Sequence, residues 1–107
     1  MSSHKENRDR FKAKIFKALS DPVRLSILDS LRNGEKCVCE IVPLFNLIQP
    51  VVSRHLKILK DCGIIKSRKE GNRRLYSVTD QRIFRIIDDL DTELVGALKD
   101  NMLEQIM

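Results

Sequence analysis

The stretch QPVVSRHLKILKDCG, residues 49–63, has the most regular helical pattern in the chain. Val52, Leu56 and Leu59 recur at intervals of four and three residues, so they line one face of a helix. Gly63 supplies the left-handed position that commonly ends a helix. The stretch therefore predicts an amphipathic helix with a buried stripe and a polar outer arc. That arc consists of Ser53, Arg54, Lys57 and Lys60.

Positive charge is concentrated in and after this helix. The 107-residue chain has 20 Lys and Arg against 15 Asp and Glu, a net charge of +5. Residues 53–76 alone contain eight basic residues and two acids, a net charge of +6. Such a local excess favours a polyanionic partner, and nucleic acid is the commonest one. The alternative is a basic face that is only solvated.

Three shorter helices are predicted before this one. The apolar spacing over residues 11–20 indicates the first, and the second begins after Asp21, a good N-cap, with Pro22 at its first position. A third is expected over residues 39–46. Residues 1–10 are polar and are expected to form a mobile arm.

A hairpin and a long helix are predicted after it. In IIKSRKEGNRRLYSV, residues 64–78, two extended runs flank Gly71 and Asn72, which permit a tight reversal. Residues 80–107 carry an apolar stripe at helical spacing. We expect this helix to be a subunit interface rather than to fold back on its own core, because the short preceding helices offer little area to cover it. The stripe consists of Ile83, Ile87, Leu90, Leu94 and Leu98.

This order of elements, α-α-α-α-β-β-α, is that of a winged helix-turn-helix in a single mainly α-helical domain, residues 1–107. In that fold the helix over residues 49–63 enters the major groove of DNA, and the hairpin, or wing, contacts the backbone. His55 has an alternative role as a packing residue, and Tyr76 is expected to anchor the hairpin in the core. The predicted helix contacts are Gln49, Ser53, Arg54, His55 and Lys57, and the predicted wing contacts are Lys69, Asn72, Arg73 and Arg74.

Three stretches resemble the ArsR/SmtB family of metal-responsive transcriptional repressors. They are FKALSDPVRLSILDSL, QPVVSRHLKILKDCGII and RKEGNRRLYSV, and the likeness extends over residues 11–78. The resemblance implies a homodimer that pairs through its first and last helices. It also implies binding to double-stranded operator DNA and release when an inducer binds. An enzyme is not expected, since no nucleophile with an oriented base is recognisable.

The stretch KCVCEI, residues 36–41, resembles the CVCD stretch of the arsenic-sensing members of this family. Cys37 and Cys39 match two of the family's three thiol ligands, and the third place falls on Val42. The resemblance implies As(III), Sb(III) or a soft divalent ion such as cadmium or lead as inducer, with no ion needed for folding. An exogenous thiol or His4 of a partner subunit could complete the site, whereas Cys62 is not expected to reach it.

Helical geometry sets a condition on these two thiols. Residues i and i+2 of a helix point about 200° apart, whereas in extended chain they share one side. Ion binding is therefore expected to require an unwound start of the third helix, and a disulfide between Cys37 and Cys39 is not expected. The alternative is that both are small buried residues. The protein is then a regulator of the same fold that responds to another signal or a partner protein.

The expected location is the cytoplasm. No apolar run approaches the length of a bilayer-spanning helix, and the polar start of the chain does not have the pattern of a signal peptide. Three cysteines without an export signal are typical of free thiols in a reducing compartment.

Overall fold

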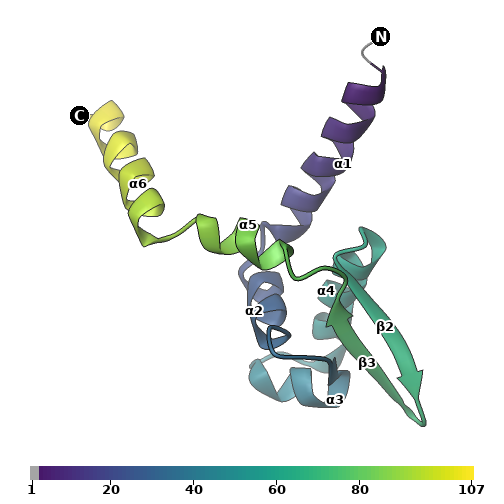
Figure 1. Ribbon diagram of the computed structural model, residues 1–107. Coiled ribbons are helices and arrows are strands. Elements are labelled where there is room, and N and C mark those ends of the chain that lie inside the picture. The colour runs from purple at the N-terminus through teal and green to yellow at the C-terminus, as the bar shows by residue number, and fades with distance from the viewer. Residues whose placement is uncertain (1–2) are drawn as a thin grey trace.

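The computed structural model describes residues 3–107, in which α2, α3 and α4 surround the core and a long hairpin lies beside them. Helices α1 and α6 project away from this body in different directions (Figure 1). The helices are α1 (Ser3–Leu19), α2 (Pro22–Ser30), α3 (Val38–Ile41), the 3-10 turn η1 (Val42–Leu44), α4 (Gln49–Asp61), α5 (Ile83–Asp89) and α6 (Thr92–Ile106); the strands are β1 (Lys36–Cys37), β2 (Ile65–Glu70) and β3 (Arg73–Val78). The predicted mainly α-helical winged helix is confirmed.

Helix α4 supplies the centre of the core. Val52 and Leu59 are completely buried and Leu56 is 1% exposed, so the predicted apolar stripe is confirmed. It packs on Ile27 and Leu28 of α2, which are also completely buried. The burial of three large side chains on one face fixes which face α4 turns to solvent.

The ends of α2 and α4 follow from local sequence. Asp21 caps α2, because its carboxylate accepts hydrogen bonds from the backbone N–H groups of Val23 and Arg24 at 2.8 and 3.2 Å. Gly63 follows α4 with a φ of +83°, as the sequence predicts. Ile48 is the N-cap of α4 and makes no capping hydrogen bond, so this helix begins without side-chain support.

The hairpin belongs to a three-stranded antiparallel sheet in the order β1-β3-β2. The register of β2 and β3 runs from Ile65 opposite Val78 to Glu70 opposite Arg73. The additional strand, β1, was not predicted. It pairs with Leu75 and Tyr76 in the middle of β3, and two residues are too few to show an alternating pattern.

Three predicted boundaries differ in the structure. Helix α1 begins at Ser3 rather than at residue 11. The predicted mobile arm, residues 1–10, is therefore part of α1 from Ser3 onward. Residues 1 and 2 lie outside the described range, and the mobility of the arm stays a prediction. Helix α3 ends at Ile41 because Pro43 removes a backbone donor and clashes with the preceding turn. The last helix is divided, since Asp91 caps α6 by accepting from the N–H of Leu94 at 2.9 Å.

Helix α6 has no buried residue and stands apart from the core (Figure 1). The alternative in which the last helix folds back on its own core is therefore wrong for this part of the chain. None of the helices within residues 3–107 is long and apolar enough to span a membrane.

Candidate DNA-binding face and thiol site

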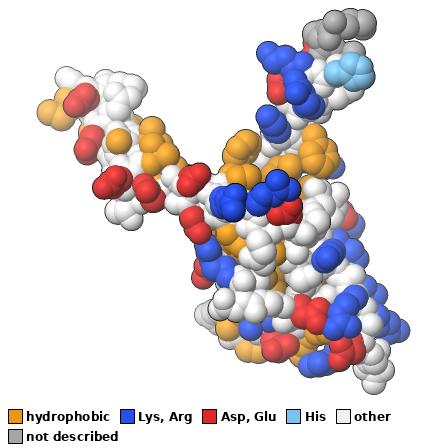
Figure 2. Space-filling model, in the orientation of Figure 1, with side chains coloured by type: hydrophobic (Ala, Val, Ile, Leu, Met, Phe, Trp, Pro, Cys, Tyr) orange, Lys and Arg blue, Asp and Glu red, His pale blue; other side chains and the backbone are white. Residues whose placement is uncertain are grey.

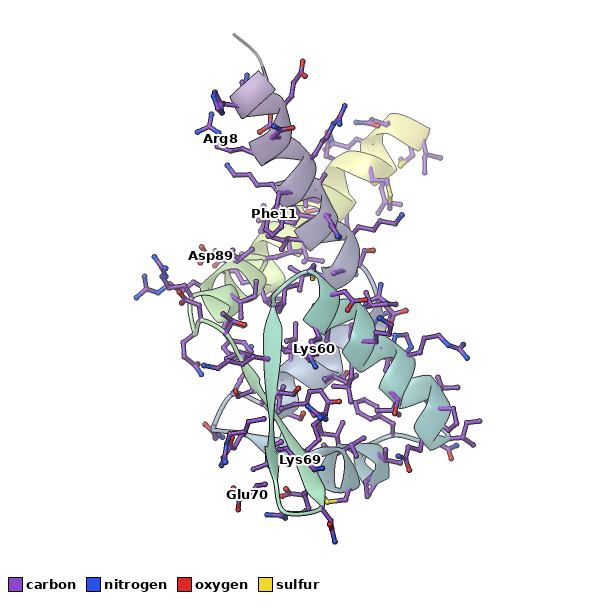
Figure 3. The ribbon with its side chains drawn as sticks, turned by 90° about the vertical axis from the view of Figure 1, so that its right-hand side faces the viewer. Arg8, Phe11, Lys60, Lys69, Glu70 and Asp89 are labelled. Carbon is purple, nitrogen blue, oxygen red and sulfur yellow. A yellow bond between two sulfur atoms is a disulfide. The ribbon has the colours of Figure 1, made fainter. Side chains whose placement is uncertain are left out.

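The exposed side of α4 and the tip of the wing are basic. Arg54 and Lys60 of α4 and Lys69 and Arg73 of the wing are exposed, and their side chains make no hydrogen bond or ion pair within residues 3–107. Figure 3 shows Lys60 on α4 and Lys69 with Glu70 at the far end of the hairpin. Unpaired cations on two adjoining elements leave this face free to contact phosphate groups.

Other basic side chains near this face already have partners. Lys57 binds Asp61 one helical turn away, with 2.8 Å between Nζ and Oδ2. Arg74 donates to the hydroxyl of Ser67 at 3.1 Å. These two predicted contacts remain exposed, so they can exchange their partners for DNA at small cost, because exposed ion pairs contribute little.

Arg68 is held more firmly than the other wing cations. Its Nε donates to Glu35 Oε2 at 2.9 Å, and its Nη2 lies 2.7 Å from Glu70 Oε2. A hydrogen bond to Glu35, and to a smaller extent one to Glu70, raises the pKa of the guanidinium above its ordinary value. Arg68 therefore ties the wing to the chain just before β1, a role that the sequence pattern did not reveal.

The remaining predicted DNA contacts lie at different depths. Gln49 is exposed at the first position of α4, Asn72 is exposed in the hairpin turn, and Ser53 is half-buried. His55 faces α2, where its Nδ1 lies 3.2 Å from Arg24 Nη1 and 3.9 Å from Asp21 Oδ1. This position favours the packing role for His55. Tyr76 packs against the core, as predicted.

Cys37 and Cys39 meet at the junction between β1 and α3. Cys37 is 1% exposed and extended, with φ −78° and ψ 161°, whereas Cys39 is exposed on the first turn of α3. Their Cα atoms are 5.2 Å apart and the sulfur atoms are joined as a disulfide. The expectation that they do not pair is wrong in this structure, because one residue is extended and the next is helical, which brings both sulfurs to one side. The predicted unwinding of α3 is not needed either.

A carboxylate lies beside the two sulfurs. The sulfur atoms and one carboxylate oxygen of Glu40 lie within 4.8 Å of one another. Glu40 Oε1 also accepts a hydrogen bond from the backbone N–H of Cys37 at 3.1 Å. Cys62, by contrast, is buried at the end of α4 and donates its thiol to Leu59 O at 3.3 Å, so it does not belong to this group. Sulfur and carboxylate donors in the reduced chain suit a thiophilic or borderline ion.

The thiol site and the wing share one sheet. Cys37 lies opposite Leu75 of β3, and Lys36 lies opposite Tyr76. The Glu35–Arg68 ion pair joins the same two segments a few residues away. A movement of Cys37 would therefore disturb the pairing that positions the wing.

An apolar surface covers the opposite part of the molecule. Phe11 and Ile15 of α1 and Ile83 and Ile86 of α5 line a groove of about 590 Å³. Further exposed apolar side chains continue along α6, and Figure 2 shows them over α1 and α6. The exposed large apolar residues of α6 are Leu94, Leu98, Met102, Leu103 and Ile106.

Comparison with known proteins agrees with this arrangement. Residues 21–67 match the family described as bacterial regulatory protein, arsR family. The chain is also 49% identical over 80 residues to an uncharacterized HTH-type transcriptional regulator of Methanocaldococcus jannaschii, which covers 74% of this chain and 90% of the relative. The chain belongs to the ArsR family. It is a winged-helix, DNA-binding transcriptional regulator and not an enzyme.

Two further proteins are similar to this chain, one in sequence and one in structure. The arsenical resistance operon repressor of Staphylococcus xylosus is 42% identical over 77 residues, covering 72% of this chain and 74% of that repressor. The homodimeric winged helix-turn-helix domain of Mb0332 from Mycobacterium bovis superposes with a TM-score of 0.75 at 30% identity. That match covers 98% of this chain and 93% of the other.

Sequence reasoning missed two residues of this site. The family's cysteine spacing points to Val42, which is half-buried in η1, and not to Glu40. A glutamate directly after the second cysteine is a local signal that could have found it. Arg68 was counted only as part of the basic segment, and its pairing with Glu35, 33 residues earlier in the chain, has no local signal.

Proposed function

We propose that this ArsR-family regulator is a homodimeric repressor that leaves its operator when a thiophilic ion binds Cys37 and Cys39. The observation that carries the proposal is the position of the two sulfurs at the junction of β1 and α3. From that junction the chain continues into α3 and α4 on one side, and pairs with the wing on the other.

The proposed DNA contacts divide into two groups. Gln49, Ser53, Arg54 and Lys57 of α4 read base edges in the major groove, since Gln pairs with adenine and Arg with guanine. Lys69, Asn72, Arg73 and Arg74 of the wing contact phosphate and sugar, which adds affinity and register without sequence information. His55 reaches DNA only if its ring turns from Arg24, and so it is the weakest member of the set.

Homodimer formation is supported by the apolar surface on α1, α5 and α6. A 15-residue helix without tertiary packing is marginal in water, so α6 needs a partner. Charge also favours pairing of the first and last helices, because α1 contains six basic and two acidic residues whereas α6 contains three acidic residues and one basic residue. Figure 2 shows this difference in colour between the two projections.

Release from DNA is proposed to start with the reduced thiols. An ion that binds between Cys37 and Cys39 acts on β1, and β1 is held to the wing by the pairing of Cys37 with Leu75. The uncapped start of α4 at Ile48 offers little resistance to a shift of α3. To change a mostly bound population into a mostly released one, the ion must bind the released form more tightly by about 5 kcal/mol.

A second candidate is a repressor of the same family that does not respond to ions. The burial of Cys37 favours it, since a small sulfur-containing side chain also fills core space. In this case another signal or a partner protein controls DNA binding.

Gel-shift titration separates the two candidates. The protein first selects its operator from a pool of random duplexes, and the complex is then titrated with arsenite, antimonite, cadmium or lead under a phosphine reductant. We expect at least one ion to release wild-type protein but not the Cys37→Ser, Cys39→Ser double variant. Failure of every ion, or equal release of the double variant, refutes the thiol site. A protein that selects no duplex at low salt refutes the proposed DNA contacts.

A further inference from the structure

The side chains at the thiol site supply three donors rather than two. Cys37 comes from the end of β1, and Cys39 and Glu40 come from the first turn of α3. Their two sulfurs and one carboxylate oxygen lie within 4.8 Å of one another. This is the only group of three such side chains found within residues 3–107. Three donors on one short segment match the number that a protein commonly gives to an open zinc site.

Glu40 is already held in place by the backbone of its neighbouring ligand. Its Oε1 accepts the N–H of Cys37 at 3.1 Å, and its Oε2 accepts no hydrogen bond within residues 3–107. The carboxylate can therefore coordinate an ion through Oε2 while Oε1 keeps the hydrogen bond to Cys37. A ligand that is oriented by a hydrogen bond loses less conformational freedom when the ion binds.

We propose that Cys37, Cys39 and Glu40 form a site of two thiolates and one carboxylate that takes a divalent ion such as cadmium or zinc. This inference rests on the proposed function, and it names the class of inducer. The dithiol form is the one that binds. The two thiols release two protons to solvent and three metal–ligand bonds form, without transfer of electrons.

The donor set distinguishes between classes of ion. Cadmium and zinc accept both thiolate and carboxylate ligands, and a fourth position stays open for water or a small thiol. Trivalent arsenic and antimony prefer three sulfurs and gain little from a carboxylate in water. Two thiolates and a carboxylate carry a charge of −3, so a divalent ion reduces the charge of the site to −1.

The inference is tested by cadmium titration of the 107-residue protein in the dithiol state. Sulfur-to-cadmium charge-transfer absorption reports binding, and competition with a chelator gives the affinity. Glu40→Gln is the test variant, since its amide oxygen can still accept from Cys37 N–H. Asp89→Asn, at an exposed carboxylate of α5, removes one negative charge without removing a ligand or a contact of the thiol site, and it serves as the matched control.

We expect Glu40→Gln to weaken cadmium binding by at least about tenfold, because even lost outer-shell partners of a metal cost 10- to 100-fold. Asp89→Asn should bind cadmium like wild type, and arsenite affinity should be the same in wild type and Glu40→Gln. Equal cadmium affinity of Glu40→Gln and wild type overturns the role of Glu40, and an equal loss for arsenite overturns the preference for divalent ions. Neither result affects the proposed function, which has its own refuting outcomes: no ion releases the wild type, the double serine variant is released equally, or the protein selects no duplex at low salt.

Discussion

Replacement of Leu98 by Ala tests the proposed subunit interface on α6. Leu98 is 56% exposed in the single chain. Full burial of a leucine side chain contributes about 1.5–3 kcal/mol, so burial of the exposed half contributes about 1 kcal/mol in each subunit. Because the interface of a two-fold dimer contains both copies, the change costs about 2 kcal/mol, which corresponds to about a 30-fold weaker dimer. Alanine is also the best helix former, so α6 itself is preserved.

Sedimentation equilibrium over a range of protein concentrations measures the dimer dissociation constant. Leu44→Ala is the matched control, because Leu44 is 57% exposed but lies in η1, away from the proposed interface. We expect the control to dimerise like wild type and the circular dichroism of both variants to be unchanged. If Leu98→Ala dimerises as tightly as the control, the apolar stripe of α6 is not the subunit interface.

Three further predictions concern the DNA face and the stability of the domain. Arg54→Ala should reduce discrimination between selected and scrambled duplexes, whereas Arg73→Ala should weaken binding to both and lower the salt slope by about one; the reverse pattern would exchange their roles. Gly63→Ala should lower the free energy of unfolding in urea by about 1 kcal/mol. The cost comes from the backbone, because φ is +83°, and not from a clash, because an added Cβ meets no atom within 4 Å. Hydrogen bonds from Arg82 lower the pKa of Asp80 from 3.8 to about 2. The ionised carboxylate therefore stabilises the folded state fully above pH 3.8, and this stabilisation is lost as the pH falls through about 2. The urea midpoints of wild type and Asp80→Asn should differ at neutral pH and converge in acid.

The connection between the thiol site and the wing suggests how the proposed release from DNA occurs. The sequence alone predicts that ion binding requires the start of α3 to unwind. The structure instead has Cys37 in a strand that is paired with β3, and Glu35 beside it is paired with Arg68 of β2. Because both contacts link the start of the site to the hairpin, the proposed ion would act on α4 and on the wing together.

The sequence by itself determined the elements whose signals are local. The stripe of Val52, Leu56 and Leu59 identified α4, the Asp21–Pro22 pair identified the start of α2, and Gly71 identified the hairpin turn. These features depend on side-chain spacing along one helix, on a cap or on a backbone dihedral angle, and all of these are set within a few residues. The order of those elements was then enough to predict the winged helix.

The tertiary structure alone decided which distant segments meet. It paired β1 with β3, joined Arg68 to Glu35, turned His55 toward Arg24, and left α6 without a buried residue. It also brought Cys37 and Cys39 to one side and placed Glu40 beside them, because the chain changes from strand to helix between the two cysteines. Contacts of this kind depend on how the elements pack, and a short stretch of sequence carries no period or spacing that specifies them.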